Sequence, residues 1–132
     1  MKQEGHNIDF EASSVYHRVG GRAFFIELVD RFYQLVESDL VLRPLYPEDL
    51  EPGKRHLASF LAQYWGGPQD YSQERGHPRL RRRHMEFSIG EPERDSWITH
   101  MKSALDSMQI NDEERYEITR YFEYTATLLM NR

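Results

Sequence analysis

Apolar residues recur at helical spacing in four segments of the chain. The first segment carries Phe25, Leu28, Val29, Phe32 and Val36, which follow the i, i+3, i+4, i+7 pattern of an amphipathic helix. The same spacing returns at Leu57, Phe60, Leu61 and Tyr64, then at Trp97, Met101, Ala104, Leu105 and Met108, and finally at Ile118, Tyr121, Phe122, Thr125, Leu128 and Leu129. No segment shows a convincing strand alternation, so the sequence predicts an all-α fold of four main helices.

Turn-forming residues indicate where helices begin and end. Two serines at residues 13–14 predict the start of a short helix that stops at two glycines, residues 20–21. The Gly-Gly-Pro sequence at residues 66–68 ends the second main helix. Residues 69–77 show no period and are predicted to form a long loop, after which Pro78 opens a short helix through residue 87.

The remaining boundaries follow from prolines and a capping pattern. Three prolines within residues 38–52 leave room for at most one helical turn there. Asn111 with Glu114 three residues later resembles a capping box and predicts the start of the last helix. Residues 1–12 are mostly polar and suggest an N-terminal tail, so we expect a single domain over residues 13–132.

Composition narrows the classes of protein that fit. Hydrophobic residues make up 39% of the chain and charged residues 30%, which is enough apolar surface for a core. The absence of cysteine excludes disulfides, thiolate catalysis and iron–sulfur clusters. A net charge of −5 argues against general nucleic-acid binding. We expect a cytoplasmic protein without a membrane span, because no signal-like start and no apolar run of about 20 residues is present.

Common catalytic and metal-binding patterns are missing. None of the six histidines has the His-x-x-x-His spacing of a helical zinc site. The glycine pairs end helices and do not form a phosphate-binding loop. Composition alone leaves a Ser-His-Asp hydrolase open, although no nucleophile-elbow pattern is present.

His84 is the histidine whose neighbours suggest chemistry. A lone histidine on an apolar helix face is more often a core residue than a ligand. Here, however, Leu80 shares its face, Arg83 precedes it and Phe87 follows it. An iron porphyrin needs this combination of one imidazole, apolar walls and cations for its propionates.

The arginine run at residues 79–83 is open to three interpretations. It fits a solvated helix face, a weak nucleic-acid patch or a propionate-binding site. For Arg79 and Arg82 we expect solvation. A buried Trp97 indole or Tyr33 hydroxyl would need a polar partner, although each could equally be plain core.

The segment YWGGPQDYSQERGHPRLRRRHMEF closely resembles the block that contains the proximal histidine in group II, or O-type, truncated haemoglobins of bacteria. The resemblance extends over VYHRVGG, RFYQLV, LVLRPLYPEDL and ERDSWITHM, and only residues 1 to about 12 fall outside it. It implies a truncated globin fold, in which two antiparallel helix pairs form a two-over-two sandwich around haem.

The resemblance also implies a set of site residues. His84 would bind iron, with Arg83 and Tyr71 near the propionates. Tyr33, Tyr46 and Trp97 would line the distal side where ligands bind, and Gly53 would occupy the distal-gate position, where many relatives have Ala, Ser or Thr. His56 stands where an arginine often meets a propionate. The apolar haem contacts would be Leu57 and Phe60 on the distal face and Leu80, Phe87 and Ile89 on the proximal side.

The resemblance therefore implies a haem b globin that binds dioxygen and other diatomic ligands. Hydrogen-bond donors around a polar ligand would hold it too tightly for bulk transport, so we expect oxygen, nitric oxide or peroxide chemistry, or sensing, with an electron-donating reductase as partner. No distal histidine is placed as an acid or base, which weakens a peroxidase relative to a nitric oxide dioxygenase. The alternative is an interaction module whose arginine run, residues 79–83, binds an acidic partner. The sequence does not indicate catalytic residues or an oligomeric state.

Overall fold

The structure is a computed structural model that describes residues 14–132, and the expected tail at residues 1–12 lies outside the described residues. This part of the chain is helical without a strand. In chain order its helices are α2 (Val15–Val19), α3 (Arg22–Val36), the 3₁₀ turn η1 (Arg43–Leu45), α4 (Glu51–Tyr64), α5 (Asp70–Arg75), α6 (Leu80–Arg83), α7 (Glu91–Asp106) and α8 (Asp112–Leu128). None of these helices is long and apolar enough to cross a lipid bilayer.

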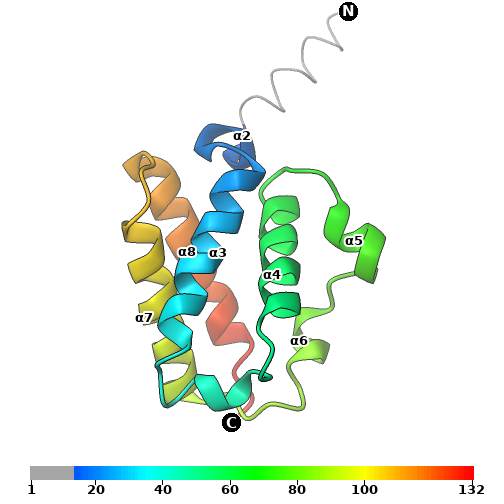
Figure 1. Ribbon diagram of the computed structural model, residues 1–132, viewed down its shortest axis with the longest axis vertical. Coiled ribbons are helices and arrows are strands. Elements are labelled where there is room, and N and C mark those ends of the chain that lie inside the picture. Colours follow the sequence, from blue (N-terminus) through cyan, green and yellow to red (C-terminus); the bar gives the residue numbers. More distant parts are fainter. Residues whose placement is uncertain (1–13) are drawn as a thin grey trace, which may run out of the picture.

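Two antiparallel helix pairs form the framework. α3 runs antiparallel to α4, and α7 runs antiparallel to α8 (Figure 1). α3 packs on both α4 and α7, which joins the two pairs. This arrangement confirms the all-α prediction and the two-over-two helix sandwich.

The core lies where the two pairs meet. Phe25, Leu28, Phe32 and Val36 of α3 are fully buried, together with Leu61 of α4, Met101 and Leu105 of α7, and Ile118 and Phe122 of α8. Burying a large apolar side chain stabilises the fold by about 1.5–3 kcal/mol. Most periodic positions of the sequence therefore do form the core, but two do not. Leu128 is 48% exposed, and Tyr64 is 52% exposed and stacks on Tyr121 with ring centroids 4.2 Å apart.

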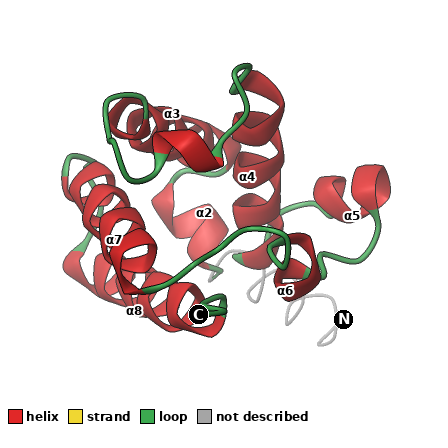
Figure 2. Ribbon diagram, turned by 90° about the horizontal axis from the view of Figure 1, so that it is seen from below, coloured by secondary structure: helices red, strands yellow, loops and turns green. Residues whose placement is uncertain are grey.

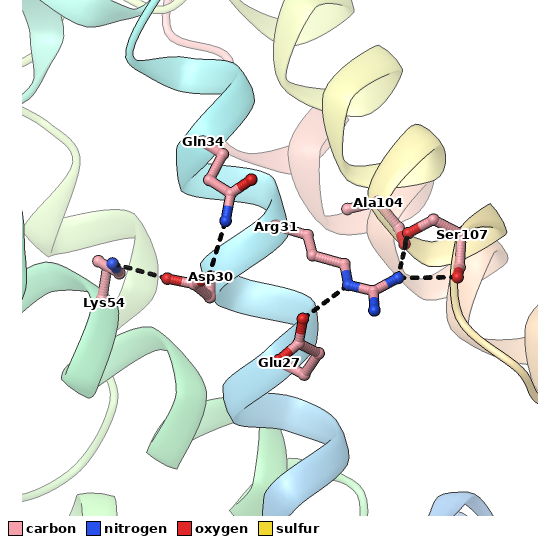
Figure 3. Close-up of polar contacts among 7 residues, drawn as sticks. All are labelled: Glu27, Asp30, Arg31, Gln34, Lys54, Ala104 and Ser107. Atoms are coloured by element: carbon pink, nitrogen blue, oxygen red, sulfur yellow. Dashed lines mark hydrogen bonds and ion pairs between the residues drawn. The ribbon is translucent and has the colours of Figure 1, made fainter.

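Polar contacts fix α3 against its neighbours on both sides (Figure 3). Asp30 of α3 pairs with Lys54 of α4 at 2.8 Å. Arg31 reaches the C-terminal end of α7, where it donates to the carbonyl oxygen and the hydroxyl of Ser107, each at 2.8 Å. Helices α3, α4 and α7 carry the residues predicted for the distal side, so these contacts fix the positions of the three helices relative to one another.

Several predicted boundaries are confirmed and some local predictions are wrong. α2 begins at the Ser14 cap and ends at Gly20, and the proline-rich connector holds only η1. Residues 69–77 are not a plain loop, because residues 70–75 form α5. The short helix after Pro78 is confined to α6. Glu114 does not cap Asn111 but is buried and accepts a hydrogen bond from Arg18 Nε at 2.9 Å.

Candidate functional site

Three aromatic residues predicted for one side of the site lie together. Tyr33 on α3 is buried, and its ring meets that of Tyr46 at 5.6 Å, edge to face. Tyr46 is the C-cap of η1, and Trp97 on α7 packs against Phe32 with ring centroids 5.3 Å apart. The prolines that break the helix between α3 and α4 thus bring Tyr46 back toward α3 and α7.

Burial raises the pKa of both tyrosines. The pKa of Tyr33 rises to about 12, opposed by the nearby Lys54 ammonium. For Tyr46 the rise is caused by burial and then by Tyr33, and hydrogen bonding with the Trp97 side chain opposes it. Both hydroxyls are therefore protonated at neutral pH and can donate hydrogen bonds.

Gly53 is the third residue of α4 and lies directly beside Tyr33. A Cβ atom added at residue 53 would lie 2.8 Å from the Tyr33 hydroxyl oxygen. An alanine, serine or threonine here would therefore displace the hydroxyl. The absence of a side chain at residue 53 leaves the room in which the tyrosine oxygen lies.

His84 presents one ring nitrogen to the protein and leaves the other free of it. It caps the C-terminus of α6, and its Nδ1 lies 2.6 Å from the carbonyl oxygen of Leu80. Because a carbonyl only accepts, Nδ1 carries a proton, so the neutral ring has its lone pair on Nε2, the tautomer suited to metal ligation. Nε2 has no hydrogen-bond partner among the described residues.

Asn131 near the C-terminus holds the segment that follows His84. Its Nδ2 donates to the carbonyl oxygens of Phe87 at 2.7 Å and His84 at 3.3 Å. Its Oδ1 accepts from the Ile89 backbone N–H at 2.8 Å, and its own N–H donates to the Ile89 carbonyl oxygen at 2.8 Å. Figure 2 shows this connection between α6 and α7 passing the end of α8. The sequence does not predict this role, because a lone asparagine after a helix carries no long-range signal.

A group of cations surrounds Tyr71, which is buried on α5. The guanidinium carbons of Arg75 and Arg83 lie 6.0 and 5.9 Å from the centre of its ring. Arg83 donates to two carbonyl oxygens, those of Pro78 at 2.8 Å and Arg75 at 3.2 Å, and Arg75 contacts His56 Nδ1. Neither arginine has a carboxylate partner among residues 14–132. The cluster thus holds positive charge that an external anion could neutralise.

Burial and positive charge lower the pKa of His56. Burial is the largest cause, followed by Arg75 and Arg55. Arg75 itself was missed in the sequence, because residues 69–77 were interpreted as a loop. As a helix, that segment places Arg75 four residues from Tyr71 and on the same face.

The apolar site residues come from three parts of the chain. On α4, Phe60 is buried and Leu57 is half-buried, and Phe60 meets Tyr71 edge to face at 5.4 Å. Leu80 of α6 packs on the core while remaining half-buried. Phe87 and Ile89 lie half-buried in the connection to α7. The contacts of these side chains with a cofactor stay predictions.

The pair Asp39–His100 links the connector between α3 and α4, which contains Tyr46, to α7. Asp39 accepts from the backbone N–H groups of Val41 and Leu42 at 2.7 and 2.9 Å, which shapes the turn after α3. His100 Nε2, one helical turn beyond Trp97, reaches the other Asp39 oxygen at 2.5 Å. The pair therefore links the elements that carry Tyr46 and Trp97.

The donor set fits haem. Among residues 14–132 no group of three or more His, Asp or Glu side chains could hold a metal ion by itself. One imidazole with a fixed tautomer suits a metal whose other ligands come from a macrocycle, and unpaired arginines beside Tyr71 suit carboxylate groups. With the two-over-two helix pairs, these features define a truncated globin.

Comparisons with known proteins agree. The sequence model of the family described as "Bacterial-like globin" matches residues 14–131. A group 2 truncated hemoglobin of Bacillus subtilis is 39% identical over 112 residues, which cover 85% of each chain. A solved hemoglobin of Chloroflexus aurantiacus superposes with a TM-score of 0.89 at 50% identity, covering 90% of this chain and 98% of the other. A truncated oxygen-avid haemoglobin of Bacillus subtilis superposes with a TM-score of 0.86 at 38% identity, covering 90% and 100%.

The chain belongs to the bacterial-like globin family and is a truncated haemoglobin of group II. As a globin it binds haem, and through haem it binds dioxygen and other small diatomic ligands. Membership of this family does not favour the alternative of an interaction module built on the arginine run.

Proposed function

We propose that this globin holds haem b with His84 Nε2 as the axial ligand and retains dioxygen for chemistry or sensing rather than bulk transport. The observation that carries the proposal is the 2.6 Å contact between His84 Nδ1 and the Leu80 carbonyl oxygen. A backbone carbonyl on Nδ1 fixes the ring and raises the basicity of Nε2. Haem supplies the iron to which dioxygen and similar ligands bind.

The protein positions the cofactor with charges and apolar side chains. Arg83 and Arg75 bind the propionates beside Tyr71, and the lowered pKa of His56 makes it a neutral partner there at neutral pH. Leu57 and Phe60 cover one face of the porphyrin, while Leu80, Phe87 and Ile89 contact the side of His84. The bounds of the globin domain, residues 13–132, stay a prediction, and the family model matches residues 14–131.

Tyr33, Tyr46 and Trp97 stabilise a polar ligand on the opposite side. All three are donors at neutral pH, and Gly53 admits the Tyr33 hydroxyl to the position beside α4. A hydrogen bond to a charged group is worth about 1.5–3 kcal/mol, so two donors slow ligand release by several orders of magnitude at most. The Bacillus subtilis relative is described as oxygen-avid, which supports slow release here.

The reaction follows from slow release. A retained dioxygen lasts long enough to react with nitric oxide, so a nitric oxide dioxygenase is favoured over a transporter. Peroxidase-like turnover is the second candidate. It is less favoured because the distal donors are two tyrosines and a tryptophan, and no distal histidine is placed to act as a general acid or base. Either cycle needs an electron-donating reductase, and a cytoplasmic location remains a prediction.

Haem titration of the purified protein tests the proposal. Wild-type protein is expected to show a Soret band and to bind one haem per chain, with reversible binding of dioxygen and carbon monoxide. His84→Gly should lose haem or bind it weakly, with partial rescue by added imidazole. His77→Gly is the matched control, since His77 is exposed and nearby. A His84→Gly protein with unchanged Soret and ligand spectra would refute the assignment.

A further inference from the structure

The short helix α6 carries a basic surface whose charges have no partner among residues 14–132. Arg81 and Arg82 are exposed on α6, and Arg79 is exposed at its N-cap. None of these three side chains makes a hydrogen bond, ion pair or ring contact within residues 14–132. Arg22 and Arg55 differ in this respect, because Arg22 pairs with Asp70 and Arg55 pairs with Glu74. We call Arg79, Arg81 and Arg82 the α6 basic surface.

This surface is a positive region on a negative protein. Residues 75–83 hold five of the 17 basic residues and no Asp or Glu, although the whole chain has 22 acidic residues and a net charge of −5. Along the sequence, the nearest acidic residues are Glu74, which is paired with Arg55, and Glu86, which is exposed beyond His84. Such a charge separation orients an acidic partner so that it approaches α6 first.

The α6 basic surface adjoins the proposed axial ligand. His84 ends α6, and its backbone N–H donates to the Arg81 carbonyl oxygen at 3.2 Å. Arg83 of the same helix turns toward Tyr71 and is engaged with backbone carbonyls. One helix therefore directs Arg83 and His84 toward the site and Arg81 and Arg82 toward solvent.

The proposed chemistry requires an electron from outside. A haem held by this chain would, after oxidation to the ferric state, need one electron from a donor before it could bind dioxygen again. The chain has no cysteine, so it carries neither a dithiol nor a thiolate-bound iron–sulfur cluster as an internal donor. The electron must come from a separate reductant.

We propose that the α6 basic surface docks an acidic one-electron donor protein of the iron–sulfur or flavin class. This inference rests on the proposed haem function. The donor is oxidised by one electron and the ferric haem is reduced to the ferrous state, and no covalent bond forms or breaks. Nucleic acid fits this surface less well, because three arginines around a four-residue helix are bordered by a protein of negative net charge.

The test uses the haem-loaded full chain and a strongly acidic [2Fe–2S] ferredoxin as probe. Binding of oxidised ferredoxin to the carbon monoxide form is titrated by calorimetry, and reduction of the ferric form by ferredoxin is followed under carbon monoxide. The test variant is Arg81→Gln with Arg82→Gln. Arg79 is left unchanged because its φ is 49°, so a substitution there would alter the backbone strain as well as the charge. The matched control is Lys102→Gln with Arg120→Gln, which removes one half-buried positive charge from α7 and one exposed positive charge from α8.

Wild-type protein should bind ferredoxin at low salt and lose most of this affinity at about 0.5 M salt, where charges are screened within a few ångströms. The Arg81/Arg82 variant should bind about threefold to thirtyfold more weakly at low salt and be reduced correspondingly more slowly at limiting ferredoxin. The control should stay within about twofold of wild type. In every variant, excess dithionite should give the same final ferrous spectrum.

Three results would overturn the docking surface. The first is that the wild type shows no salt-dependent binding of ferredoxin. The second is that the control variant loses as much ferredoxin affinity as the Arg81/Arg82 variant. The third is tight, salt-dependent binding of a DNA duplex that the Arg81/Arg82 variant loses while its ferredoxin binding is unchanged. Each is distinguishable from failure of the proposed function, which would appear as a protein without a Soret band after haem addition.

Discussion

The Tyr33 hydroxyl lies against the backbone of Gly53, at a place where even a methyl group would come within 2.8 Å of its oxygen. Real Cβ atoms do not approach an oxygen so closely, so the tyrosine oxygen and a side chain at residue 53 exclude each other. The position on α4 therefore controls where a donor on α3 lies. The Asp30–Lys54 pair keeps these two helices together one residue beyond Gly53.

The first prediction concerns this coupling. Gly53→Ala should move the Tyr33 hydroxyl and raise the oxygen off-rate by about threefold to tenfold, which corresponds to part of one hydrogen bond. The measurement is stopped-flow displacement of dioxygen by carbon monoxide. In a Tyr33→Phe background the same alanine should have an effect within about twofold, because the clashing oxygen is gone. Additive effects in the four proteins would contradict the coupling.

The framework could be predicted from the sequence for physical reasons, whereas His84 as the iron ligand follows from the resemblance and stays a prediction. Phe25, Leu28 and Phe32 repeat at helical spacing, and the glycines at residues 20–21 stop a helix whatever its surroundings. The block around His84 was specific enough to indicate the family, which the comparisons confirm.

Contacts between distant elements could not be predicted. Arg75 needed the helix α5, whose residues 70–75 carry no apolar period. Asn131 acts on Phe87 and Ile89 through hydrogen bonds that span more than 40 positions of the chain. Local patterns contain no information on such pairings, because each partner would satisfy the same local rules if it were solvated.

The second prediction concerns the cations around Tyr71. Arg75→Gln and Arg83→Gln should each speed haem loss to an acceptor apo-globin by about threefold to thirtyfold. Each variant removes one charge-assisted hydrogen bond between a partly exposed guanidinium and a propionate. Arg82→Gln should change the rate by less than about twofold, because Arg82 is exposed and has no partner in the described chain. Equal haem loss in the Arg82 and Arg83 variants would contradict the propionate assignment.

The third prediction concerns the Asp39–His100 link and its dependence on pH. The Leu42 N–H, then His100 and the Val41 N–H, lower the pKa of Asp39, while burial opposes them. A carboxyl with a lowered pKa in the folded state stabilises the fold above its unfolded pKa of about 3.9 and loses this contribution as pH falls through the folded value. Asp39→Asn should therefore destabilise the protein by about 1 kcal/mol at pH 7.

Urea unfolding of the ferric protein at a series of pH values measures this effect. The gap between wild type and Asp39→Asn should shrink below about pH 4. Asp49→Asn is the matched control, because Asp49 also accepts a backbone N–H, from Glu51 at 3.1 Å, without a histidine contact in the described structure. A gap that is independent of pH, or equal in the control, would show that the charge of Asp39 does not stabilise the turn.

The last prediction is that Trp97 sets the lifetime of bound dioxygen. Its indole N–H is an obligate donor, and it lies close enough to Tyr46 to oppose the rise of that pKa. Phenylalanine keeps most of the packing against Phe32 but removes the N–H. Losing one charge-assisted hydrogen bond of about 1.5–3 kcal/mol should raise the oxygen off-rate by roughly tenfold to a hundredfold.

Three comparisons separate direct donation by Trp97 from an indirect effect through Tyr46. Carbon monoxide, which is less polar when bound, should respond less than dioxygen to Trp97→Phe. Tyr46→Phe should reproduce a large part of the change if the indole acts through that hydroxyl, whereas direct donation by Trp97 leaves the Tyr46 variant near wild type. The double variant then gives the coupling between the two side chains. An off-rate within about twofold of wild type for Trp97→Phe, with Tyr33→Phe equally silent, would show that these donors do not retain oxygen.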